Sequence, residues 1–202
     1  MAAPGVAGLI LTSTTTDEAA GQTGGRWSRG GDLLWRWGNP RNYGAGSDAD
    51  RHLDYQHDPT WVAGTNPAEV RLLVFNNGMR RATKDSHVEE LVLPFDPRSG
   101  FTRQAGAPFG PDAPAWSYSD GENFYSAFIS GAQRLTNGNT LICAGAPGRV
   151  FEVTRSGEIV WDYWNPHGGD IEPSPQGGRA PPQALFRATR LAPNHPGLAG
   201  RL

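Results

Sequence analysis

The chain has 202 residues, of which 27 are glycine, 17 proline and seven tryptophan; 37% are hydrophobic, and the formal net charge is −2. This composition indicates a globular domain of short strands and turns and excludes a disordered chain. The slightly acidic charge argues against nucleic-acid binding, which needs a basic surface. Cys143 is the single cysteine, so an intrachain disulfide and a cysteine-based zinc site are excluded.

Motifs for membranes, metals and nucleotides are missing from the sequence. No apolar run approaches the length of a membrane span, and the apolar start lacks the basic residues of a signal peptide. No phosphate-loop or dinucleotide motif occurs, and no two histidines have metal-ligand spacing on one element. The sequence therefore predicts no membrane span, no metal and no cofactor, and leaves the location of the chain open.

The first predicted unit covers residues 5–40. Gly8 to Ser13, GLILTS, has the pattern of an inner β-strand, and LLWRWGNP, ending at Pro40, that of an outer strand. The polar, glycine-rich stretch between them is long for a loop, and long loops in a compact domain are usually functional or mobile. An apolar strand at the start of this unit would expose a sheet edge.

The second predicted unit covers residues 56–118. RLLVFNNG, from Arg71 to Gly78, repeats the inner-strand pattern, and HVEELVLP, from His87, reads as the following strand. AWSYSDG, with Trp116 and Tyr118, is a weaker copy of the outer strand of the first unit.

The third predicted unit, residues 129–166, carries the clearest pattern. Asn137-Gly138 and Ser156-Gly157 stand between β-branched and aromatic runs, which is a strong hairpin signal because glycine adopts the positive φ that tight turns need. The unit therefore reads as four short strands, at Ala132 to Leu135, Thr140 to Cys143, Val150 to Val153 and Ile159 to Tyr163.

The three units repeat the same order of parts. Trp35 aligns with Trp161 and Trp37 with Tyr163, and we expect the tryptophans at these matching positions, with Trp116, to pack in the core. RATRL, within residues 185–191, repeats a first-strand pattern. Four strands in under about 40 residues is the size of one β-propeller blade. The prediction is an all-β fold over residues 1–202: an incomplete β-propeller of about three four-stranded blades plus a closing strand.

The segments STTTDEAAGQTGGRWSRGGDLLWRWGNPRNYG, QHD, LLVFNNG and FISGAQRLTNGNTLIC together resemble the bacterial arylsulfotransferase family. The resemblance covers almost the whole chain. It implies a propeller enzyme that moves a sulfuryl group from an aryl sulfate donor to a phenolic acceptor through a sulfohistidine. Because a closed propeller has at least about four blades, the chain reads as a C-terminal portion of such a protein. A full-length parent would act outside the cytoplasm, and exposed blade edges would favour self-association.

Candidate site residues come from the starts of the first strands, which line the channel of a propeller. Aligning these strands matches His57-Asp58 with Ser130-Gly131 and Phe186-Arg187. His57 is the candidate nucleophile or acid–base group, because neutral imidazole is nucleophilic and leaves readily near neutral pH. Asp58 would orient it or cap a turn. Arg187 would hold a sulfate through its planar fork, or form a surface salt bridge.

Two further positions complete the candidate site. Ser130 is the substrate-binding counterpart of His57 in the third unit, and Asn77 can donate to sulfuryl oxygens, although NNG is also a good turn sequence. Tyr55 and Trp61 flank His57 and would stack on an aromatic substrate or, more simply, belong to the core. Because only one of the aligned positions is a histidine, the sequence leaves open a non-catalytic propeller that binds a ligand or protein, or an inactive fragment of the enzyme.

Overall fold

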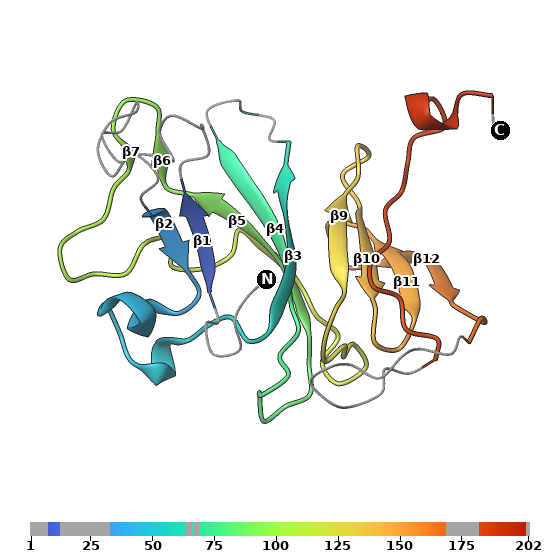
Figure 1. Ribbon diagram of the computed structural model, residues 1–202, viewed down its shortest axis with the longest axis horizontal. Helices are drawn as coiled ribbons and strands as arrows, with labels where there is room; N and C mark the ends of the chain where they lie inside the picture. Colours follow the sequence, from blue (N-terminus) through green and yellow to red (C-terminus); the bar gives the residue numbers. More distant parts are fainter. Residues whose placement is uncertain (1–7, 13–32, 64–65, 67–68, 169–181, 201–202) are drawn as a thin grey trace.

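The computed structural model describes residues 8–12, 33–63, 66, 69–168 and 182–200. Its described regular structure is β-strand apart from three short 3-10 helices, so the all-β prediction is confirmed. The strands form two four-stranded and two two-stranded antiparallel sheets. Strands β3 and β9, from different sheets, lie beside each other in the middle of the molecule (Figure 1). Within the described ranges, no helix has the length and apolar character to cross a membrane.

The third predicted unit forms one of the four-stranded sheets. Its order is β9-β10-β11-β12, so each strand pairs with its neighbour in the sequence. Gly138 and Gly157 have φ of 88° and 89° in the two predicted turns, a conformation that glycine adopts without steric cost. The strands are β9 (Gly131–Arg134), β10 (Thr140–Ala144), β11 (Arg149–Val153) and β12 (Ile159–Trp164), within one residue of the predicted bounds.

The second predicted unit forms the other four-stranded sheet, with the order β3-β4-β5-β8. Its two central strands are buried on both faces, which explains the continuous apolar run in RLLVFNN: Leu73 and Phe75 face one core cluster, and Leu72 and Val74 face the other. The strands are β3 (Gln56–Val62), β4 (Val70–Asn76), β5 (His87–Leu93) and β8 (Trp116–Tyr118). In the chain, a separate small hairpin of β6 (Phe95–Asp96) and β7 (Gly100–Phe101) follows β5 and precedes β8.

The first predicted unit differs from the expected four-stranded sheet. Of its expected strands only β1 (Leu9–Thr12) and β2 (Leu33–Trp37) lie in the described ranges, and residues 13–32 lie outside them. The two strands pair directly with each other. Their counterparts by sequence pattern, β10 and β12, are separated by β11. The direct pairing of β1 with β2 therefore differs from the arrangement of their sequence counterparts in the sheet of β9–β12.

Two hydrophobic clusters hold the sheets together. The sheet of β3, β4, β5 and β8 is the central sheet, and burial of apolar side chains on both of its faces is the main favourable contribution to folding in such a stack. One cluster joins β4, β5 and β8 to β9–β11, with Phe124 from the connecting loop in edge-on contact with Phe75 and Phe151. The other packs Trp35 and Trp37 of β1–β2 onto the opposite face of β4 and β5. The helices η1 (Pro40–Tyr43) and η2 (Asp48–Asp50) follow β2, and η3 (Pro196–Leu198) lies near the C-terminus.

Two predictions about the outer parts of the fold need correction. The closing strand expected at 185–191 does not form. Instead, this segment runs beside the sheet of β9–β12, the third sheet, and contacts it through isolated backbone hydrogen bonds, including Leu185 N to Gly145 O and Ser130 N to Phe186 O. Trp35 is buried, as expected, but Trp161 is 43% exposed. All six residues of β12 are exposed, because no described element covers the outer edge of that sheet.

Candidate functional site

His57 is held in one tautomer by a buried amide. Asn77 is fully buried, and its Nδ2 donates to Ser126 O at 2.7 Å and to Ile129 O at 2.9 Å. Both partners are carbonyls, so the amide orientation is fixed, and Asn77 Oδ1 must accept the hydrogen bond from His57 Nδ1 at 2.7 Å. Tyr55 O, 3.0 Å from Nδ1, is also an acceptor.

The hydrogen bond from Nδ1 determines the state of the other ring nitrogen, Nε2. Because Nδ1 carries the proton, Nε2 of the neutral imidazole carries the lone pair. His57 is half-buried, and Nε2 has no hydrogen-bond partner among the described residues. The arrangement is that of an oriented imidazole, able to act as a nucleophile or a general base at Nε2.

The backbone around His57 is strained on both sides of the junction between the central and third sheets. Tyr55 and Asp58 have φ of 56° and 50°, and Ile129 and Ser130 have φ of 49° and 88°. Residues other than glycine rarely adopt this region, and a β-branched residue such as Ile129 is a true outlier there. The register of β3 also shifts between His57 and Thr60, so Asp58 lies on a bulge. Strain and bulges of this kind concentrate at functional sites.

Asp58 bridges the central sheet to the C-terminal segment. Its Oδ1 lies 2.8 Å from Arg187 Nη1. Burial raises the pKa of Asp58, and the nearby charges of Arg187 and His57 offset only part of that rise. Gly131 is required beside it, because a Cβ at Gly131 would come within 2.2 Å of Asp58 Oδ2. The aligned first-strand positions thus meet in space.

Ser130 belongs to a buried hydroxyl network. Its Oγ donates to Ser126 Oγ at 2.8 Å and accepts from Gly145 N at 3.0 Å. Ser126 Oγ in turn accepts from Ala146 N. These hydrogen bonds tie the connecting loop to the turn between β10 and β11, and they fix the carbonyls that orient Asn77.

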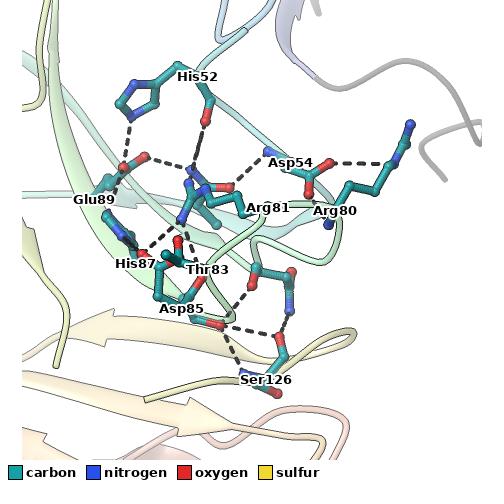
Figure 2. Close-up of polar contacts among 12 residues, drawn as sticks. His52, Asp54, Arg80, Arg81, Thr83, Asp85, His87, Glu89 and Ser126 are labelled. Atoms are coloured by element: carbon teal, nitrogen blue, oxygen red, sulfur yellow. Dashed lines mark hydrogen bonds and ion pairs between the residues drawn. The ribbon is translucent and has the colours of Figure 1, made fainter. Parts of the chain in front are cut away.

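A second polar cluster beside β4 and β5 was not predicted from the sequence (Figure 2). Glu89 is 1% exposed and lies 2.8 Å from His52 Nε2, with Asn76 Nδ2 at 3.4 Å. His87 lies between two carboxylates, 2.6 Å from Asp85 and 3.7 Å from Glu89. Burial alone would raise the pKa of Asp85, but bonds from His87 and Thr83 bring the pKa below its usual value.

A third cluster joins the central and third sheets on the face away from Glu89. Glu90 is 2% exposed and binds Arg71 of β4 at 2.6 Å, Arg134 of β9 at 2.5 Å and Arg155 of the β11–β12 turn at 2.7 Å. Trp116 packs under Arg134, whose guanidinium lies 4.4 Å from the ring centroid. Successive strand residues point to opposite faces, which is why adjacent Glu89 and Glu90 meet different partners.

The remaining candidates lie as follows. Asn77, which the sequence suggested as a donor to sulfuryl oxygens or as a turn residue, has both amide hydrogens committed to backbone carbonyls. Trp61 is 61% exposed, which contradicts its expected place in the core. Tyr55 lies under Arg80, whose guanidinium is 4.8 Å from the ring centroid. Among the described residues, no group of three histidine, cysteine, aspartate or glutamate side chains can hold a metal. Burial raises the pKa of Cys143 to about 11, so its thiol is unreactive.

Comparisons with known proteins add no family to this description. No protein-family model, no curated protein and no solved structure matches the chain. The functional argument therefore depends on the geometry of the chain itself.

Proposed function

We propose that the chain is an arylsulfotransferase-like protein built on part of a β-propeller, and that His57 carries the sulfuryl group between an aryl sulfate and a phenol. One observation supports this most strongly: the bond from Nδ1 to buried Asn77 leaves the Nε2 lone pair of His57 available. Two successive four-stranded sheets, each with its strands paired in chain order and with β3 and β9 adjacent, support the propeller architecture (Figure 1).

The proposed chemistry needs only the side chains at this junction. Nε2 attacks the sulfur of the aryl sulfate, the S–O bond to the aryl group breaks, and the phenolate leaves with the bond's electron pair. In the second step the oxygen of a phenolic acceptor attacks sulfur, and the S–N bond breaks with its electron pair returning to Nε2. The acceptor's proton passes to water, and the phenolate released in the first step takes up a proton in exchange. Arg187, half-exposed and paired with Asp58, supplies positive charge for the sulfuryl oxygens. Asn77 and Ser130 act as positioning residues.

His57→Ala is expected to lower phenol-dependent release from an aryl sulfate by at least about a thousandfold, as loss of a nucleophile does. The measurement is turnover of a chromogenic aryl sulfate with and without a phenol. The matched control is His167→Ala, since His167 is exposed. A folded His57→Ala protein with unchanged turnover would disprove the role of His57.

A second candidate function is a non-catalytic propeller that binds a ligand or protein. It is favoured by the third sheet, where the counterpart of His57 is Ser130, a buried residue whose hydroxyl is used in structural bonds. Well-folded wild-type protein that turns over no aryl sulfate would contradict the enzyme and leave the binding protein or an inactive fragment of the enzyme.

The same proposal includes self-association through the exposed edge of β12. Trp161 and Tyr163 stack there at 6.1 Å with their planes 9° apart, next to an edge that no described strand covers. Trp161→Glu is expected to shift the sedimenting species from dimer to monomer. Trp61→Glu is the matched control, because Trp61 is also an exposed tryptophan but lies on another strand. An unchanged mass for Trp161→Glu, or dissociation by both variants, would contradict this assignment.

A further inference from the structure

Two adjoining hollows lie on either side of η1: the larger is bounded by η1, η2 and the loop after β4, and the smaller by β1, β2 and η1. The larger has a volume of about 670 Å³ and the smaller about 280 Å³. Asn39 and Asn42 line both of them, so the two hollows share a wall. Their combined volume suits a small organic molecule.

The larger hollow is positively charged. Its lining includes Arg41, Arg51 and Arg80 but only one carboxylate, Asp48, which pairs with Arg41. Arg80 lies 3.5 Å from Asp54 and over the Tyr55 ring. The hydrogen bond from Arg41 and, to a lesser extent, the charge of Arg51 lower the pKa of Asp48, so this one carboxylate faces two arginines. Guanidinium groups without a full complement of carboxylates are suited to an anion.

The smaller hollow is mainly apolar. Leu9, Trp37 and Tyr43 line it, and the Arg36 guanidinium lies 5.7 Å from the Tyr43 ring centroid. Rings and an aliphatic side chain at one end, with arginines at the other, match a ligand that has an aromatic body and an anionic end.

Asn39, in the shared wall, carries an unused acceptor. The residue is 6% exposed, and its Oδ1 has no hydrogen-bond partner among the described residues. It stands at the N-cap of η1, yet its side chain makes no capping bond. A buried acceptor left open in this way is unfavourable, and it shows that packing in this wall of the free chain is incomplete.

We propose that the two hollows form one cleft for an aromatic anion, with the anionic group at Arg51 and Arg80 and the ring at Trp37 and Tyr43. The cleft adjoins the residues before His57 on both sides: Arg80 covers Tyr55, and Gln56 Nε2 donates to Gly8 O, in the lining of the smaller hollow. Identifying the ligand with a sulfuryl donor or acceptor rests on the proposed function; the binding itself does not.

The test is calorimetric titration of the whole chain with 4-hydroxybenzenesulfonate, benzenesulfonate and phenol. The hydroxylated sulfonate and benzenesulfonate are expected to bind within about twofold of each other, because the covered Asn39 Oδ1 cannot accept from the ligand hydroxyl. Phenol, which lacks the anion, is expected to bind at least about tenfold more weakly than the hydroxylated sulfonate.

Matched variants locate the site. Arg51→Gln and Arg80→Gln are each expected to weaken sulfonate binding about tenfold, since each removes a charge-assisted contact. Arg98→Gln, an exposed arginine in the β6–β7 turn, is the control and is expected to bind as the wild type does. Wild-type protein that does not bind the sulfonate, or equal binding by all three variants, would overturn the cleft.

His57→Ala separates the cleft from the chemistry. It is expected to keep sulfonate affinity within about twofold, because His57 does not line either hollow. Sulfonate binding without aryl-sulfate turnover would leave the cleft standing and refute the proposed enzyme. Turnover that depends on His57 but not on Arg51 or Arg80 would support the proposed enzyme and refute the cleft as the site of its sulfuryl donor or acceptor.

Discussion

Glu90→Gln is expected to lower the free energy of unfolding by about 3–5 kcal/mol, as loss of one partner from a buried ionic cluster does. Glu90 is buried between Arg71, Arg134 and Arg155, and its two oxygens accept from all three. The neutral amide removes the negative charge but leaves Arg134, whose side chain is 9% exposed, without its counter-charge. The loss exceeds that of a surface salt bridge because this guanidinium cannot regain full hydration.

The same cluster predicts the acid sensitivity of the fold. Burial alone would raise the pKa of Glu90, but the bonds and charges of Arg71, Arg134 and Arg155 outweigh it and hold the pKa below its usual value. Because the pKa is depressed in the folded state, this stabilisation is complete above the unfolded pKa of about 4.3 and is lost as pH falls through the folded value. The Glu90→Gln protein is expected to lose less stability over that acid range than the wild type.

Urea unfolding followed by tryptophan fluorescence, at pH 7 and at intervals down to pH 3, measures both effects. Glu158→Gln is the matched control, because Glu158 is exposed in the β11–β12 turn. A Glu90→Gln loss below about 1 kcal/mol at pH 7, the range of surface pairs, would show that the cluster is solvated and contributes little.

Sequence patterns located the strands where local chemistry decides the structure. Gly138 and Gly157 mark tight turns whatever packs around them, so the third sheet was predicted within one residue. The error over Trp161 has the opposite origin. Its alignment with Trp35 is correct as a pattern, but burial requires an element that covers the side chain. The central sheet covers Trp35, and Trp35 Nε1 donates to the carbonyl of Gly110.

The candidate site was only partly predictable for the same reason. Equivalent positions in repeated units meet in space, which brought Asp58 to Arg187 and placed Gly131 beside them. The partners of Glu90 come from three separate elements, up to 65 residues away in sequence. The Asn77–His57 bond likewise depends on how β3 and β4 pair around a bulge. No local pattern in one sequence reports such contacts, although two adjacent glutamates in a buried strand signal that cations must lie nearby.

Asn77→Asp is expected to lower the free energy of unfolding by about 3 kcal/mol or more, since it deprives two buried carbonyls of their donors and introduces a buried charge. The substitution conserves volume, so packing changes do not contribute. The affected acceptors are Ser126 O and Ile129 O. Asn123→Asp is the matched control, because Asn123 is exposed in the loop before β9. Thermal melts of both variants measure the difference, and equal melting temperatures would contradict the structural role of Asn77.

The tautomer of His57 distinguishes a positioning role for Asn77 from a merely structural one. In wild-type protein at pH 8, nitrogen-15 spectra are expected to show Nδ1 protonated and Nε2 bare, because both neighbours of Nδ1, Asn77 Oδ1 and Tyr55 O, can only accept. Asn77→Ala removes one acceptor, and the tautomers are expected to mix while the exposed His167 keeps its spectrum. If Nε2 carried the proton in the wild type, it would have no lone pair for sulfur, and nucleophilic transfer through this nitrogen would be excluded at that pH.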